Sequence, residues 1–309
     1  MSTAVGATDR PPRRLKVGLF LPVGEQMMAG ETPHWTDLLA MARLAEDVGF
    51  DSLWLADHLL MQFPFGTIGA WECWSLLAAL AASTQRVELG PLVSCTGYRN
   101  PALLAKMADT VDEISGGRLI LGLGAGWAKL EHRAYGYPFD HRASRFEEAI
   151  QIICGLLREG RMDFAGRYYQ ARECELRPRG PRAQGPPILI GTARPRMLRL
   201  AARYADCWNA EWKTLGQLPE LCGAVDVACA DVGRAPTTLV RTAAVRIDLP
   251  NAQRRGFGMA HASNSGNPEE IAAILRGYAA AGITHIQAWI NPNTPTGIEA
   301  FAPILNLLD

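Results

Sequence analysis

The apolar positions of this chain alternate between short continuous runs and longer stretches with a three- to four-residue period. Residues 87–93 and 119–123 are continuous apolar runs of strand length, and apolar residues recur at helical spacing between Leu103 and Ile114. Asparagine caps helices and proline fits their first turn, so Asn100-Pro101 favours a helix start, and two glycines favour its end. Asp112 falls outside the apolar face of this helix. The stretch predicts a strand–helix–strand unit with parallel strands and a right-handed crossover.

The same alternation runs along the rest of the chain. The pattern breaks at 162–177, where residues 163–169 favour a small hairpin. Irregular loops are expected at 59–70, 128–140 and 251–266. Strands are expected at 16–21, 52–56, 87–93, 119–123, 188–190, 207–209, 241–249 and 283–290, and helices at 35–48, 71–82, 101–115, 142–158, 195–204, 215–232, 267–281 and 297–308.

Regular strand–helix succession over this length predicts an α/β fold with a closed barrel. Eight such units are typical of a (β/α)8 (TIM) barrel, and an open doubly wound sheet rarely needs so many. We therefore expect a disordered N-terminal tail at 1–14 and a single barrel domain over 15–309, with a small hairpin insertion after the fourth helix.

Composition narrows the classes of function. Lys+Arg and Asp+Glu both number 31, a balance that gives no support for binding nucleic acid or an anionic membrane. Apolar runs stay well short of the ~20 residues that span a bilayer, and the N-terminus lacks the apolar segment of a secretory signal. The seven cysteines are scattered without a CxxC pair, which favours the reducing cytoplasm. The histidines show no metal-ligand spacing, so no metal site is predicted.

Residues suited to chemistry follow several strands. His58 follows the second strand beside Asp57, where an imidazole suits acid–base work, although a structural role fits the position equally well. Small residues at 94–97 and 124–126 would let a flat ligand approach, and Trp127 would wall its pocket; an ordinary polar loop and a packing tryptophan are the alternatives. Cys95 is not expected to be a nucleophile, because no histidine lies near it in sequence.

The turn after the fifth strand is a candidate anion site. Residues 191–195 lead into a helix whose first N–H groups are free to bind an anion. Arg194 and Arg196 would add positive charge there. The alternative is that both arginines are simply solvated.

Taken together, these segments resemble the luciferase-like monooxygenase superfamily. The matching sequences are GFDSLWLADH (49–58), LGPLVSCTGYRNPALLAKMADTVDEISGGRLILGLGAGW (89–127), EHRAYGYPF (131–139), ILIGTARPRMLRLAARYADCWN (188–209) and, more weakly, GITHIQAWINP (282–292). The resemblance implies a (β/α)8 barrel that binds FMN or the deazaflavin coenzyme F420 at its C-terminal face. It also implies a homodimer.

The resemblance further implies roles for individual residues. Asp57-His58 looks more like the deazaflavin branch, with His58 as proton donor or acceptor and Asp57 orienting it. A bulge with a non-proline cis peptide behind the ring is expected at Ser94–Cys95. Apart from the resemblance, Glu72 is a second acid–base candidate, because a carboxylate at the start of an apolar helix needs a partner or a chemical role; a structural hydrogen bond is the alternative. The implied cofactor-binding residues are Ser94, Cys95, Thr96, Asn100, Gly124, Gly126, Gly191, Thr192, Ala193 and Arg194, and the substrate pocket would contain Phe63, Trp71, Glu72 and Trp127.

Three functions follow as hypotheses. The first is hydride transfer between coenzyme F420 and a small to medium organic substrate. The second is a monooxygenase that uses reduced FMN and O2, with a flavin or deazaflavin reductase as the partner that supplies the cofactor. The third is a non-catalytic flavin-binding barrel, against which the intact Asp57-His58 pair argues. The loops that would read the substrate, at 22–33, 59–70 and 251–266, mix apolar and polar residues.

Overall fold

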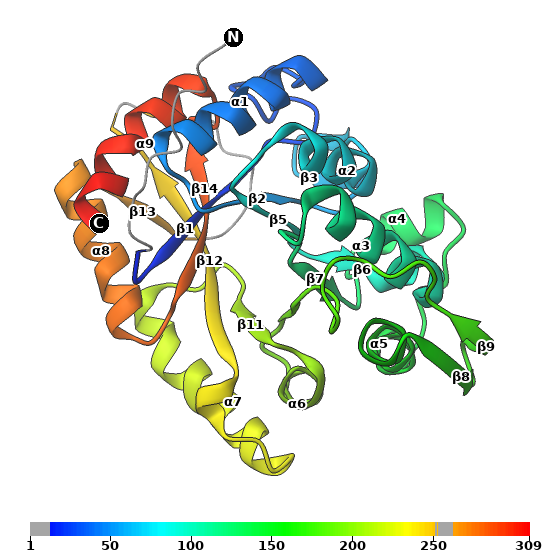
Figure 1. The fold of residues 1–309 in the computed structure, drawn as a ribbon. Helices are drawn as coiled ribbons and strands as arrows, with labels where there is room; N and C mark the ends of the chain where they lie inside the picture. Colours follow the sequence, from blue (N-terminus) through cyan, green and yellow to red (C-terminus); the bar gives the residue numbers. More distant parts are fainter. Residues whose placement is uncertain (1–12, 251, 253–261) are drawn as a thin grey trace, which may run out of the picture.

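A parallel barrel forms the centre of the molecule (Figure 1). The computed structural model describes residues 13–250, 252 and 262–309. Within them β5 and β6 share one of eight barrel positions, and the short β13 (Ser263–Ser265) pairs only with β12, outside the ring. This confirms the expected (β/α)8 barrel. Its strands follow one another in chain order: β1 (Lys16–Phe20), β2 (Ser52–Leu55), β5 (Glu88–Pro91) with β6 (Ser94–Cys95), β7 (Leu121–Gly124), β10 (Ile188–Gly191), β11 (Cys207–Ala210), β12 (Val240–Asp248) and β14 (His285–Asn291).

The third barrel strand is interrupted between β5 and β6. Pro91 still pairs with Leu55 of β2, whereas Ser94 pairs with Leu123 of β7. The peptide between Leu92 and Val93 is cis. The expected cis peptide at Ser94–Cys95 is therefore wrong, because those two residues already lie in the parallel ladder with β7.

Helices cover the outside of the barrel, and their ends follow local rules. Asn100 caps α3 by accepting from the N–H groups of Ala102 and Leu103, and Gly49 ends α1 in the left-handed conformation that glycine favours. Neighbouring helices pack together around the ring, α1 on α9, α2 on α3, α3 on α5 and α6 on α7. The covering helices are α1 (Trp35–Val48), α2 (Cys73–Ser83), α3 (Pro101–Ser115), α5 (Arg142–Glu159), α6 (Pro195–Tyr204), α7 (Leu218–Asp231), α8 (Pro268–Ala280) and α9 (Pro295–Leu308).

Two segments expected to be irregular contain regular structure. β3 (Leu60–Phe63) and β4 (Gly66–Gly69) form an antiparallel hairpin, and the short helix α4 (Lys129–Ala134) follows β7. Phe, Pro and Gly dominate the first segment, and α4 has only six residues, so neither gives a strong periodic signal. The expected insertion is confirmed as the hairpin of β8 (Arg161–Ala165) and β9 (Gln170–Glu175).

A compact apolar core fills the barrel interior. Trp54 is completely buried there, and Gly18 and Gly90 make room for its indole, since an added Cβ would lie 2.5 Å from Nε1 and 2.6 Å from Cζ3, respectively. The indole N–H donates to the Ser52 hydroxyl. Because Phe20 belongs to this core and also lines the cavity described below, the core forms part of the cavity floor.

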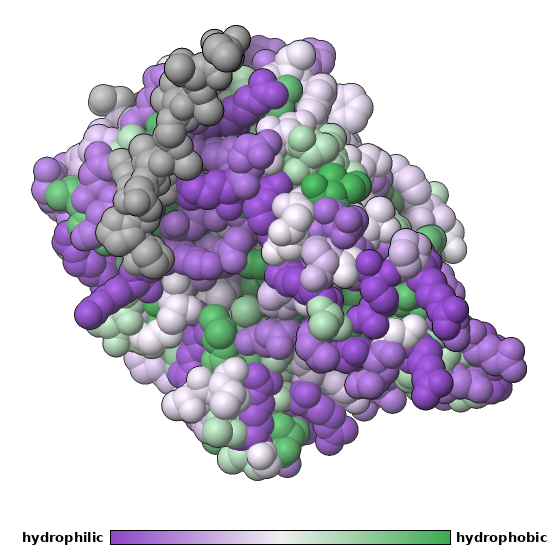
Figure 2. Space-filling model, in the orientation of Figure 1, coloured by the Kyte–Doolittle hydropathy of each residue, from purple (hydrophilic) through white to green (hydrophobic). Residues whose placement is uncertain are grey.

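The outer surface differs in character from this core. The face in Figure 2 is mainly hydrophilic, with hydrophobic residues in small separate patches. No helix of the described residues is long and apolar enough to cross a membrane.

Residues 1–12 of the expected tail, and most of the loop expected at 251–266, lie outside the described residues. Arg13, by contrast, donates to the Gly49 carbonyl and the Asp51 carboxylate.

Candidate active site

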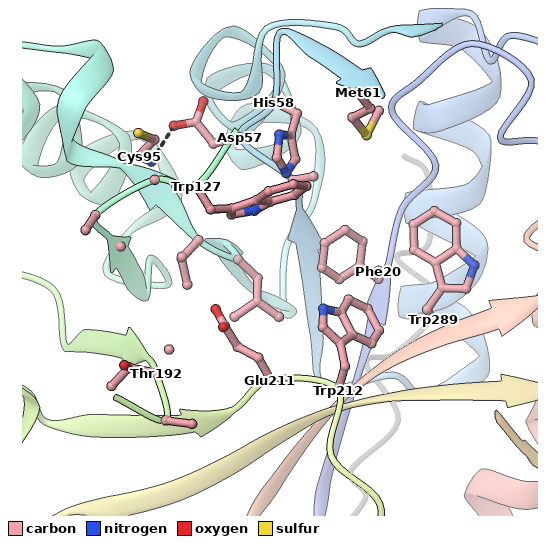
Figure 3. A pocket seen from close by; sticks show the side chains of 18 of the residues that line it. Phe20, Asp57, His58, Met61, Cys95, Trp127, Thr192, Glu211, Trp212 and Trp289 are labelled. Carbon is pink, nitrogen blue, oxygen red and sulfur yellow. Dashed lines mark hydrogen bonds between the residues drawn. The ribbon is translucent and has the colours of Figure 1, made fainter. Parts of the chain in front are cut away.

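A cavity of about 770 Å³ opens where the barrel strands end. Figure 3 shows its two sides. On one side, His58 follows β2, Cys95 ends β6 and Trp127 follows β7. On the other, Thr192 follows β10 and Glu211 follows β11. An aromatic wall completes it: Phe20 lies 5.5 Å from Trp289 and 6.0 Å from Trp212, measured between ring centroids.

His58 is held by a buried carboxylate from α4. Its Nδ1 lies 2.9 Å from Oε2 of Glu131, whose side chain is fully buried. Glu131 also accepts from the Tyr98 hydroxyl at 2.7 Å and from the N–H groups of Leu59 and Leu60. Burial raises the pKa of Glu131, but the hydrogen bond and charge of His58 and these further bonds hold it below the ordinary value. An ionised Glu131 requires a proton on Nδ1 of His58, which leaves Nε2 to exchange protons.

Asp57 does not orient His58, contrary to the expectation. Its carboxylate pairs with both terminal nitrogens of Arg99, at 2.6 and 3.0 Å. It also accepts from the Ser94 hydroxyl and from the Cys95 backbone N–H, the bond drawn in Figure 3. Asp57 therefore ties the end of β2 to β6.

Cys95 and Gly126 lie against each other at the cavity wall. An added Cβ on Gly126 would lie 2.5 Å from the Cys95 sulfur, and Gly126 has a φ of +74°. Burial raises the pKa of Cys95 to about 12, so its thiol stays protonated and is a poor nucleophile. On the other side, an added Cβ on Gly124 would lie 2.6 Å from a methyl of Val93. Both glycines bring the backbone of β7 close to the cavity.

The start of α6 forms the polar end of the cavity. Gly191, Thr192, Ala193 and Arg194 all line it, and the helix starts at Pro195 with no side-chain cap. The exposed Arg194 side chain borders the free N–H groups of this helix, so the segment suits an anion. Arg196, the second expected cation, instead pairs with Glu147 at 2.7 Å.

Several predicted site residues lie outside the cavity and act structurally. Ser94 accepts from the Trp74 indole behind the wall, and Thr96 donates to the Gly124 carbonyl. Asn100 caps α3. Trp71 is about half exposed and donates to the Pro33 carbonyl. Glu72 caps α2 and pairs with Arg99, which fits the structural alternative.

The structure also adds residues that sequence reasoning missed. Glu131 is one of them: its helix is short and its partner His58 lies 73 residues away, so the sequence does not single it out. Glu211 and Trp212 directly follow β11, and their position at a strand end was an available signal. Phe20 and Trp289 fall inside the expected strands 16–21 and 283–290, where nothing marks them as site residues; they pack in the core and also face the cavity.

The cavity fits a flat cofactor with an anionic tail. Leu92, Val93 and the glycines of β7 leave one wall without bulky polar groups, and the α6 start supplies donors and Arg194 at the far end. Among the described residues no group of three or more His, Cys, Asp or Glu side chains is placed to hold a metal ion.

The fold and this cavity are those of a (β/α)8-barrel protein with its site at the carboxyl ends of the strands. The family model described as luciferase-like monooxygenase matches residues 15–249, and the chain belongs to that family.

The chain's relatives include a dehydrogenase, a reductase and a monooxygenase. The chain is 33% identical to the F420-dependent hydroxymycolic acid dehydrogenase of Mycobacterium tuberculosis over 78% of its own length and 65% of that protein. It is 35% identical to the 5,10-methylenetetrahydromethanopterin reductase of Archaeoglobus fulgidus over 53% of its length and 46% of the reductase, so it spans about half of that relative. It is 28% identical to the pyrimidine monooxygenase RutA of Stutzerimonas stutzeri over 96% of its length and 87% of RutA.

Solved structures show the same fold. An F420-dependent secondary alcohol dehydrogenase, in complex with an F420–acetone adduct, superposes with a TM-score of 0.82 at 18% identity, covering 96% of this chain and 99% of the other. The monooxygenase RslO1 of Streptomyces bottropensis superposes with a TM-score of 0.78 at 21% identity, covering 94% and 99%. At these identities the likeness concerns the fold alone.

Proposed function

We propose that the protein is an oxidoreductase that transfers a hydride between coenzyme F420 and a small to medium organic substrate. The main support for the proposal is the His58–Glu131 pair at the cavity. Nδ1 of His58 is bound to Glu131, so Nε2 is available for proton transfer to a substrate. The likeness to the F420-dependent hydroxymycolic acid dehydrogenase supports the choice of cofactor.

The chain's own residues divide the work. The α6 start with Arg194 would bind the phosphate of the cofactor, and Leu92, Val93 and Gly124 would support its ring. When bound, the reduced deazaflavin supplies the hydride. Nε2 of His58 would donate the accompanying proton to the substrate, or accept it in the reverse direction, while Glu131 stabilises the protonated imidazole.

The aromatic wall would bind and shield the substrate. Phe20, Trp212 and Trp289 gather on one side of the cavity in Figure 3, and they offer apolar surface that excludes water. We propose a substrate with an apolar or planar body that carries a carbonyl or alcohol group near His58.

A monooxygenase that uses reduced FMN and O2 is the second candidate. The alignment with RutA over nearly the whole chain favours it. In that case a separate reductase would supply reduced FMN. For either cofactor we propose a homodimer.

Titration of the purified protein with both cofactors tests the proposal. We expect oxidised F420 to bind more tightly than FMN in either redox state, measured by quenching of cofactor fluorescence or by calorimetry. Arg194→Ala should weaken the binding of either phosphorylated cofactor, and Arg172→Ala, on the exposed β8–β9 hairpin, is the matched control. Tighter binding of reduced FMN than of F420 would favour the monooxygenase.

A further inference from the structure

The proposed chemistry leaves one carboxyl group of the cavity without a role. Glu211 follows β11 directly and lines the cavity, and in Figure 3 its side chain points toward the cavity centre. Trp212 follows it and turns to the aromatic wall. Glu211 is thus an acid beside the aromatic wall, in a cavity that Lys213 also lines.

The carboxyl group is held in place by the neighbouring strand end. An added Cβ on Gly191 would lie 2.4 Å from Oε1 and 2.8 Å from the carboxyl carbon of Glu211, so the glycine of β10 makes room for it. Burial raises the pKa of Glu211, and the positive charge of Lys213 lowers it. No hydrogen bond from the described residues contributes to this pKa. Glu211 is half-buried in the cavity wall, and a carboxyl there that accepts no hydrogen bond from the described residues is available to a ligand.

Barrel topology sets this group opposite His58. Around the barrel, β11 is the fourth strand from β2 in both directions. One path passes β1, β14 and β12, and the other passes the interrupted strand of β5 and β6, then β7 and β10. In a ring of eight positions this is the far side of the barrel. A ring system that lies against Leu92 and Val93 with one edge at His58 therefore presents its opposite edge toward Glu211.

The chemistry of such a partner follows from the group itself. A protonated carboxyl has a donor and an acceptor side by side in one plane. Its complement is an acceptor next to a donor in a ring, as in the –CO–NH–CO– edge of a cyclic imide. An ammonium group would instead require the ionised form, which the burial of Glu211 disfavours.

We propose that Glu211 binds a cyclic imide edge through paired hydrogen bonds. The inference rests on the proposed function in one respect: the pyrimidine ring of F420 or of FMN carries such an edge. A pyrimidine substrate beside the cofactor carries the same edge. The two sources share one chemistry, and Glu211 fixes the position of the ring relative to His58 in both.

Binding measurements on three forms of the full-length protein test the proposal. The three forms are wild type, Glu211→Ala and Glu211→Gln. Each is first titrated with oxidised F420, FMN and N3-methyl FMN. Each is then loaded with the cofactor that binds better and titrated with uracil. Glutamine keeps one donor and one acceptor, whereas alanine has neither. Thermal unfolding of all three forms controls for folding. Two lost hydrogen bonds correspond to about a 10- to 100-fold change in Kd.

Each outcome decides the matter. If the cofactor ring is the ligand, Glu211→Ala raises the Kd of the cofactor about 10- to 100-fold, Glu211→Gln stays within about 3-fold of wild type, and N3-methyl FMN binds wild type and alanine variant alike. If a substrate ring is the ligand, cofactor affinity is unchanged, and uracil binding is lost in the alanine variant but kept in the glutamine variant.

The proposal is overturned if the alanine variant binds cofactor and uracil as wild type does, or if the glutamine variant is as weak as the alanine variant. Wild type that binds neither F420 nor FMN contradicts the proposed function as well. In that case uracil is titrated without cofactor, and a failure to bind it overturns the role of Glu211 too.

Discussion

Among single residues, the buried carboxylate of Glu131 decides how His58 can act. It accepts the Nδ1 proton of His58 and three further hydrogen bonds, so it is held in its ionised form. The sequence alone predicts His58 at a strand end from its position. It does not predict Glu131 as the partner, because 73 residues separate them and the nearer Asp57 is the obvious choice. The contact between His58 and Glu131 depends on the packing of α4 against β3, which the sequence pattern does not reveal.

Replacement of His58 by alanine tests its role in proton transfer. We expect turnover to fall by about 10²-fold or more, because general acid–base catalysis contributes at least that factor. Cofactor affinity should stay within a few-fold of wild type. The measurement is steady-state turnover of a substrate that the wild type converts, together with the Kd of the cofactor. Near-normal turnover with intact affinity would remove His58 from the mechanism.

The pH dependence of stability tests the ionised state of Glu131. Its pKa is lowered from about 4.5 in the folded protein, so its stabilising effect is present above that value and is lost as the pH falls through the folded value. Glu131→Gln should lower the free energy of unfolding by about 1–3 kcal/mol at pH 7, and by less at pH 3. Urea unfolding at both pH values measures this, and an equal loss at both would contradict it.

At the level of elements, periodic patterns predict the covering helices well. The expected bounds of α1 and α6 agree with the structure residue for residue. Weak patterns fail: β3, β4 and α4 are short and lie in Phe-, Gly- and Pro-containing sequence. Asp112 was expected off the buried face of α3, yet it is fully buried, because Arg182 from the connector before β10 folds over it. A polar residue can be buried wherever a distant segment supplies its partner.

The Asp112–Arg182 pair predicts a large effect on stability. Arg182 donates to both carboxylate oxygens of Asp112, at 2.9 and 2.5 Å. Arg182→Ala leaves the buried carboxylate without its cation, so we expect a loss of about 3–5 kcal/mol in the free energy of unfolding. The matched control is Arg172→Ala, which breaks the exposed pair with Asp163 and should change stability by less than about 1 kcal/mol. Equal effects in urea unfolding would contradict this reading of the connector.

For the whole molecule, the barrel follows from counting alternating strands and helices, and the site follows from where barrel strands end. That reasoning places His58, Cys95, Gly124 and Gly191 around one cavity, and the structure does so. Sequence reasoning also expected Ser94, Asn100 and Trp71 in the site, and these three do not line the cavity. Their side chains bond instead to the Trp74 indole, to the first N–H groups of α3 and to the Pro33 carbonyl. The arrangement of His58 and Glu211 on opposite sides appears only when the ring is closed.

Hydride transfer through F420 without O2 is tested most directly by an anaerobic turnover assay. The purified protein is mixed with reduced F420 and a panel of ketones and aldehydes, with O2 strictly excluded, and the visible absorbance of oxidised F420 is followed. We expect this absorbance to return with at least one substrate, with one alcohol formed per cofactor oxidised, and we expect the rate to fall sharply in His58→Ala. No return of absorbance without O2, together with an oxygenated product from reduced FMN and O2, would contradict it.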